Sequence, residues 1–96
     1  MTQFVSQHVS VPDDVLMREL DGESVILDLA TKNYYGLDDV GTRMWQALSN
    51  SDTIQEACDT LLLEYDVEPK QLQRDMQELV TQLVANGLLQ IEADQA

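Results

Sequence analysis

The side chains that most often carry catalysis or bind metals are scarce in this 96-residue sequence. His8 is the only histidine and Cys58 is the only cysteine. General bases and metal ligands work with partner groups, so a lone histidine near the N-terminus predicts an exposed side chain with no catalytic role. Cys58 falls on an apolar helical stripe, which predicts a small core residue and not a nucleophile.

Carboxylates are numerous, but their spacing favours structural roles. Asp13-Asp14 and Asp38-Asp39 stand where a strand and a helix are expected to begin. Acidic side chains at a helix start accept hydrogen bonds from free amides and suit the positive end of the helix dipole. The sequence also has no glycine-rich phosphate loop and no cysteine or histidine cluster with metal spacing. We therefore expect no enzymatic activity, no cofactor and no metal.

The charge balance restricts the choice of partners. Eighteen acidic residues against five basic ones give a formal net charge of −13. Such a field repels nucleic acid and anionic membrane surfaces, while it could attract a basic partner. No apolar run approaches the ~20 residues that span a bilayer, and the N-terminus lacks the features of a signal peptide. We expect a cytoplasmic protein that binds neither nucleic acid nor membrane.

A β-hairpin is predicted over residues 15–20 and 23–29. Asp21-Gly22 lies between these two β-prone runs and predicts a type I′ turn, which pairs Leu20 with Glu23. Strand side chains alternate, so the hairpin has two distinct faces. The face expected to form the core carries Leu16, Leu20, Val25, Leu27 and Leu29. The face expected to be mixed and partly wet carries Val15, Met17, Glu19, Ser24, Ile26 and Asp28.

A short aromatic strand over residues 34–37 should pair with the second hairpin strand after a turn in which Asn33 can adopt the left-handed conformation. In the order first, second, third, this strand has a partner on one side only, so its other row of amides and carbonyls is free. Gly36 leaves room for a close approach of another backbone. If the third helix flanks this edge, the two make a groove for an extended peptide that binds by β-strand addition.

Three helices are predicted at about 39–49, 54–65 and 69–86. Asp38 is the expected N-cap of the first, and Thr53 with Glu56 forms a capping box for the second. Pro69 suits the first turn of the third, and Gly87 suits its C-terminal stop. The buried stripes expected on the three helices are Val40, Met44, Ala47 and Leu48; Ile54, Ala57, Cys58, Leu61, Leu62 and Tyr65; and Leu72, Met76, Leu79, Val80 and Leu83.

These elements predict an α+β fold, a three-stranded antiparallel sheet followed by three helices in a winged helix-turn-helix-like layout. We expect an N-terminal arm at 1–12, one domain at 13–91 and a frayed tail at 92–96. Residues 88–91 should form a short extended segment within the domain. An alternative function for such a layout is a regulatory domain that binds DNA or another protein. Lys70 and Arg74 on the third helix are balanced by Asp75 and Glu78, which disfavours DNA.

Several motifs together resemble the PqqD family, the precursor-peptide recognition elements of ribosomally synthesised and post-translationally modified peptides (RiPPs). They are the strings at 15–29, 34–37, 41–45, 53–56, 65–67 and 87–89, together with Asp75. The stretch Tyr34-Tyr35-Gly36-Leu37-Asp38-Asp39-Val40-Gly41 is closest to the stand-alone leader-binding proteins of lasso-peptide clusters. One departure is Lys32, at a position where a turn glycine is common.

The resemblance implies that the leader of a precursor peptide adds as a strand to the third strand, against the third helix. The domain would then present the peptide to a modifying enzyme or leader peptidase. The residues that would bind the peptide are Tyr34, Tyr35, Gly36, Leu37, Leu72, Asp75, Met76 and Leu79, with Lys70 and Arg74 on the other flank of the helix as reserves. The sequence leaves open which flank faces the groove, and whether the protein is a monomer or a weak homodimer.

Overall fold

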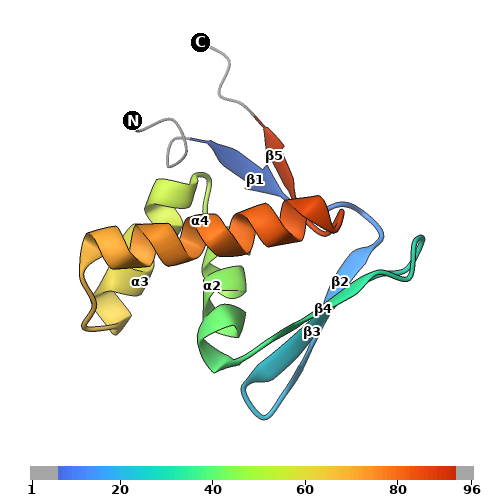
Figure 1. The fold of residues 1–96 in the computed structure, drawn as a ribbon, viewed down its shortest axis with the longest axis horizontal. Coiled ribbons are helices and arrows are strands. Elements are labelled where there is room, and N and C mark those ends of the chain that lie inside the picture. Colours follow the sequence, from blue (N-terminus) through green and yellow to red (C-terminus); the bar gives the residue numbers. More distant parts are fainter. Residues whose placement is uncertain (1–6, 93–96) are drawn as a thin grey trace.

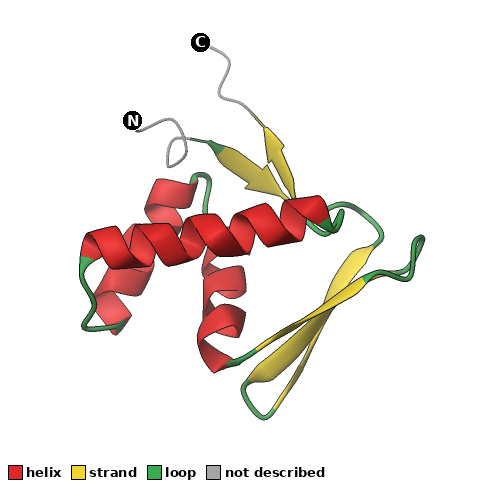
Figure 2. Cartoon of the chain, viewed as in Figure 1, coloured by secondary structure: helices red, strands yellow, loops and turns green. Residues whose placement is uncertain are grey.

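The computed structural model describes residues 7–92. Its elements in chain order are β1 (His8–Ser10), β2 (Val15–Leu20), β3 (Glu23–Asp28), β4 (Tyr34–Leu37), α2 (Asp39–Ser49), α3 (Ile54–Glu64), α4 (Pro69–Ala85) and β5 (Gln90–Glu92). The helices gather on one side of the molecule and the three-stranded sheet on the other, while a small two-stranded sheet lies apart from it (Figures 1 and 2). The predicted α+β class, with three antiparallel strands before the helices, is confirmed.

The three-stranded sheet has the order β2-β3-β4, and both pairs are antiparallel. Leu20 pairs with Glu23 as the turn type predicted. Asp21 and Gly22 have φ values of 56° and 86°, as a type I′ turn requires. In the turn before β4, Lys32 adopts the left-handed conformation, with φ 69°, and Asn33 does not.

The predicted orientation of the hairpin is wrong, although its register is right. Ile26 is fully buried, whereas Leu20 is 77% exposed and Val25 is 43% exposed. The face expected to be wet therefore packs on the helices, and the leucine-rich face points outward.

The polar groups on the inner face explain how it can be buried. The hydroxyls of Ser24 and Thr42 hydrogen-bond to each other at 2.7 Å. The carboxylate of Asp28 accepts the backbone amides of Ala30 and Thr31 at 2.9 and 3.3 Å, so this side chain serves the turn. Polar groups that are satisfied in this way can be buried without a large penalty.

The helix ends follow the sequence closely. Asp38 accepts the amide of Gly41 at 2.8 Å, as an N-cap does. Thr53 accepts the amide of Glu56, but the Glu56 carboxylate binds the amide of Asp52 and so reaches one residue beyond the capping-box partner. Gly87 has φ 74°, and the bonds from its own amide to Val84 and from Leu88 to Leu83 form a Schellman motif.

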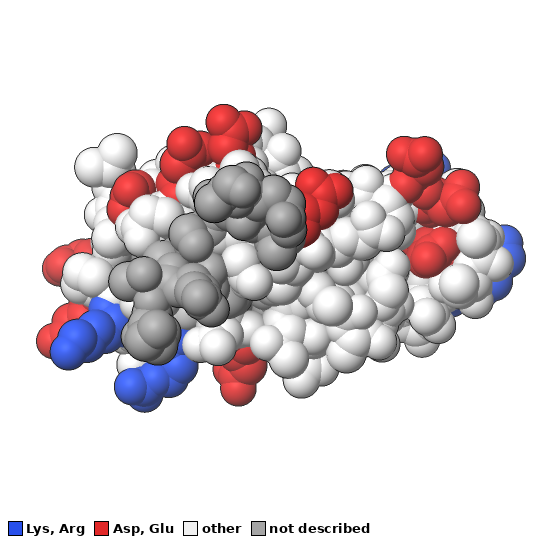
Figure 3. Space-filling view, turned by 90° about the horizontal axis from the view of Figure 1, so that it is seen from above, with Lys and Arg blue, Asp and Glu red and all other residues white. Residues whose placement is uncertain are grey.

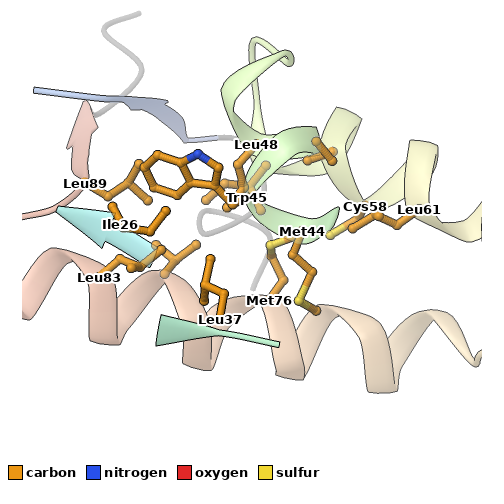
Figure 4. Packing of buried hydrophobic residues seen from close by; sticks show 14 of the residues in the cluster. Ile26, Leu37, Met44, Trp45, Leu48, Cys58, Leu61, Met76, Leu83 and Leu89 are labelled. Carbon is orange, nitrogen blue, oxygen red and sulfur yellow. The ribbon is translucent and has the colours of Figure 1, made fainter. Parts of the chain in front are cut away.

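The core lies between the helices and the inner face of the sheet. Trp45 of α2 packs near Ile26 and Leu89, while Met44 faces Met76 of α4 (Figure 4). The predicted stripe of α4 is buried at Leu72, Met76, Val80 and Leu83, and Leu79 is partly buried. Val40 was expected in the core but is 44% exposed, because it lies beside the hollow surface described below.

The chain ends of the described region pair with each other. His8–Ser10 and Gln90–Glu92 form an antiparallel two-stranded sheet, with Val9 opposite Ile91. The amide of Ile54 donates to the carbonyl of Gln7 at 3.1 Å, which ties this segment to the start of α3. The expected arm thus contains a strand. The rest of the arm (1–6) and most of the expected tail (93–96) lie outside the described residues.

Candidate functional site

β4 is an edge strand, with β3 as its only partner in the three-stranded sheet of the described chain. Tyr35 packs against the core and Leu37 is buried, whereas Tyr34 is 71% exposed on the outer face. Because side chains alternate along a strand, Gly36 shares the outer face with Tyr34. This settles which of the two tyrosines points inward.

The hydrogen-bond pattern identifies the backbone groups at the free edge. The amide of Asp28 donates to the carbonyl of Asn33 at 2.9 Å, and this pair continues the register in which Ile26 faces Tyr35. Bonded and non-bonded pairs alternate in an antiparallel ladder. Tyr35 and Leu37 therefore direct their amides and carbonyls at β3, while those of Tyr34 and Gly36 point away from the sheet.

A groove runs between this edge and α4. Two hollows of about 480 and 300 Å³ lie along it, and a third of about 110 Å³, lined from α2, α3 and α4, adjoins the first at Val40, Met44 and Asp75. The first is lined by Tyr35, Gly36, Leu37, Asp38, Val40, Gly41, Met44, Asp75 and Leu79. The second is lined by Tyr35, Asp75, Glu78, Leu79 and Gln82, and the third by Val40, Met44, Leu61, Tyr65, Val67, Leu72 and Asp75. One end of β4 is held to α4 where the side-chain amide of Asn33 donates to the carbonyl of Asn86 at 3.2 Å.

Asp75 is the residue that lines all three hollows. Of the other residues named on α4 from the sequence, Leu72 and Leu79 line one and two of them, respectively. Met76 is fully buried in the core. Lys70 and Arg74 are exposed and line none of the three. The flank of α4 that carries Asp75 therefore faces the groove.

The groove is acidic at its rim. Its described lining includes Asp38, Asp75 and Glu78 but no lysine or arginine. Asp75 accepts a hydrogen bond from the side-chain amide of Gln71 at 3.0 Å, and Asp38 is occupied as the cap of α2. Figure 3 shows one face of the molecule, on which acidic side chains lie around the edge and basic ones gather near two ends.

Sequence reasoning missed the part of the groove that α2 supplies. Val40, Gly41 and Met44 lie along the first hollow, and Gln82 extends the second. A helical wheel had placed Val40 and Met44 together in the core. Val40 is 44% exposed and lines two of the hollows, a placement that periodicity within α2 alone does not define.

The described residues contain no group of three or more histidine, cysteine, aspartate or glutamate side chains that could hold a metal ion. Burial, with a smaller effect of the Asp59 charge, raises the pKa of the Cys58 thiol above its ordinary value. The thiol is therefore protonated at neutral pH, as befits a core residue. Between residues 7 and 92, no helix is both long and apolar enough to cross a membrane.

Comparison with known proteins identifies the family. The family described as coenzyme PQQ synthesis protein D (PqqD) matches residues 23–89, which is most of the chain. The chain belongs to the PqqD family. The match begins at β3 and extends through β4 and all three helices to Leu89, so the whole groove lies within it. No curated protein matches the chain.

Two solved structures resemble this PqqD-family chain over nearly all of their length. TbiB1 in complex with the TbiA(beta) leader peptide is 34% identical, with a TM-score of 0.79, and the match covers 88% of this chain and 99% of that one. A lasso peptide synthetase B1 complexed with the leader peptide is 26% identical, with a TM-score of 0.75, and the match covers 86% of this chain and 98% of that one.

Proposed function

We propose that this PqqD-family protein binds the leader peptide of a RiPP precursor, without catalysing a reaction itself. The leader would add as a strand to β4, in the groove against α4. The observation that carries this proposal is the free row of backbone groups on Tyr34 and Gly36 directly beside a hollowed helix face. The leader-peptide complexes of the two similar structures support it.

Two kinds of interaction would supply the affinity. The amides and carbonyls of Tyr34 and Gly36 offer up to four main-chain hydrogen bonds, each with a net value of about 0.5–1.5 kcal/mol. The hollow of about 480 Å³, whose lining includes Val40, Met44 and Leu79, can accept an apolar side chain of the peptide, which would contribute about 1.5–3 kcal/mol on burial. After the cost of association, affinities between micromolar and nanomolar are reasonable, about −8 to −12 kcal/mol.

The proposal gives each of these residues a role in binding. Tyr34 and Gly36 supply the backbone edge, and Tyr35 and Leu37 shape the sheet side of the groove. Asp75, Leu79 and Leu72 line the helix side, while Met76 supports it from the core. The remaining face of the complex would be free for a modifying enzyme or leader peptidase, in the cytoplasm. Since open edges can pair with one another, the free protein would be a monomer or a weak homodimer.

Titration with a labelled TbiA(beta) leader peptide, a scrambled version of it and a DNA duplex at low salt tests the proposal. We expect saturable binding of the leader and much weaker binding of the other two. Tight DNA binding with no response to the leader would contradict the proposal and favour a regulatory winged-helix domain.

Proline substitutions locate the binding edge. Gly36→Pro removes a donor that points away from the sheet and should abolish or strongly weaken leader binding while the hairpin persists. Tyr35→Pro instead removes an amide that donates to β3, so it should destabilise the sheet itself. Comparing the two variants by circular dichroism separates a loss of binding from a loss of folding. Unchanged binding by a folded Gly36→Pro variant would exclude β4 as the binding edge.

A further inference from the structure

The outer face of the sheet carries a hollow that the groove against α4 does not include. Its volume is about 460 Å³, and it is lined by Arg18, Leu20, Glu23, Ser24, Val25, Gly36, Leu37 and Asp38. It meets the first hollow of the groove along Gly36, Leu37 and Asp38, which line both. The two hollows therefore lie on opposite sides of the same free strand edge.

We infer that this outer hollow is a second specificity pocket, which receives an outward-facing large apolar side chain of the strand that adds to β4. This inference rests on the proposed leader binding and extends it. An added strand has side chains on both faces of the sheet. Those that face inward would enter the groove beside α4, while those that face outward would lie over Gly36.

The register of the sheet places a channel beside the added strand. Arg18 pairs with Val25, and Val25 pairs with Gly36, so these three residues form one row across the outer face. Strands are spaced by about 4.8 Å. A side chain that stands next to Gly36 in the same row meets no side chain there and can lean across to contact Val25, with Leu20 beside it.

Gly36 is not required by the backbone at this position. It is not among the glycines with positive φ, and a β-carbon built on it would have no atom within 4 Å. A larger residue could therefore occupy the position without strain in the free protein. Because Gly36 has no side chain, the path from the strand edge to the outer hollow stays open.

The walls of the hollow select the class of side chain. Leu20 and Val25 are 77% and 43% exposed, so both offer apolar surface that nothing in the described chain covers. Of the three charged residues in the lining, Arg18 and Glu23 have opposite charges and the Asp38 carboxylate caps α2, so the exposed apolar walls distinguish this hollow more than its charges do. The occupant that fits is a large apolar side chain such as leucine, methionine or phenylalanine, and its burial should strengthen binding by about tenfold.

A substitution that fills the channel tests this inference. A display library of extended peptides is selected on the wild-type protein and, in parallel, on Gly36→Val, with circular dichroism used to confirm that the variant is folded. We expect the wild type to enrich a large apolar residue at one outward position. Gly36→Val should instead enrich glycine or alanine there, while the inward positions keep their preferences.

Individual peptides then give the magnitude. Replacing the large apolar residue by alanine should weaken binding to the wild type by about tenfold and leave binding to Gly36→Val almost unchanged. Leu20→Ala, which removes a wall of the hollow, should reduce the preference, whereas Leu29→Ala, on an exposed leucine outside the hollow, should not.

The outcomes separate the pocket from the function on which it depends. Identical preferences selected by the wild type and Gly36→Val would overturn the outer pocket and leave leader binding intact. Failure of the wild type to select any peptide would overturn both proposals.

Discussion

Removing the hydroxyl of Thr42 tests how the sheet is oriented on the helices. The Ser24 and Thr42 hydroxyls are buried and lie 2.7 Å apart. Thr42→Val keeps the shape of the side chain but leaves the Ser24 hydroxyl without this partner. An unsatisfied buried hydroxyl costs about 1–3 kcal/mol. We expect Thr42→Val to lower the free energy of unfolding by this amount.

The double variant isolates the interaction. Ser24→Ala combined with Thr42→Val removes both polar groups, so its cost should fall below the sum of the two single costs by about 1–2 kcal/mol. Urea denaturation followed by circular dichroism measures these differences. With a slope of about 1 kcal/mol per molar urea, Thr42→Val should lower the midpoint by about 1–3 M.

Two further variants compare the two faces of the sheet directly. Leu20→Ser, on the exposed face, should change stability by less than about 0.5 kcal/mol, whereas Ile26→Ala, on the buried face, should cost about 2–5 kcal/mol. A large loss for Leu20→Ser, or strictly additive effects of Ser24→Ala and Thr42→Val, would refute the orientation described here.

Three other predictions concern the turn, the thiol and the groove. Lys32→Gly should stabilise the protein by about 0.5–1 kcal/mol in urea denaturation, because glycine adopts positive φ without strain; a loss of stability would contradict this. Burial raises the Cys58 pKa in the folded state, so the unfolded chain loses the thiol proton at a lower pH than the folded protein does. The stability that the protonated thiol contributes is therefore complete below the pKa of the unfolded chain, and it is lost as pH rises through the pKa of the folded protein. Cys58→Ala should flatten that alkaline decline, and an identical pH profile would exclude the thiol as its source. Asp75→Lys should weaken leader binding by at least about tenfold, or 1.4 kcal/mol, since it projects a long cationic side chain where three hollows meet; Lys70→Asp, outside the hollows, should change it by less than about twofold, and equal effects of the two would argue against the groove.

Local signals in the sequence predicted the elements and their boundaries well. Asp21-Gly22 specified the turn type and hence the register, and Asp38, Thr53 and Gly87 marked helix ends. Each of these signals acts within a few residues of itself. The family resemblance predicts a binding site on β4 and α4, and the family itself is confirmed by the match over residues 23–89.

The features that could not be predicted depend on contacts between distant parts of the chain. Counting apolar residues favoured the leucine-rich face of the hairpin as the core. The opposite face can be buried because the hydroxyl of Ser24, which lies on it, is hydrogen-bonded to Thr42, 18 residues away in the chain. The pairing of β1 with β5 joins strands of three residues from opposite ends of the chain, too short to leave a periodic pattern.

The outward orientation of the leucine-rich face bears on the proposed function. This exposed face lies beside the free edge of β4, where it would contact the added peptide if the proposal holds. Part of the apolar pattern in this sequence would then serve binding and not folding, which would explain why hydrophobicity misassigned the two faces.

Hydrogen exchange of the β4 amides during leader binding tests the central proposal most directly. In the free protein, the amides of Tyr35 and Leu37 should be protected by β3, while those of Tyr34 and Gly36 exchange quickly. Addition of a saturating leader peptide should slow exchange at Tyr34 and Gly36 by at least about tenfold, as expected for new main-chain hydrogen bonds. Binding that leaves these two amides unchanged would contradict strand addition at β4.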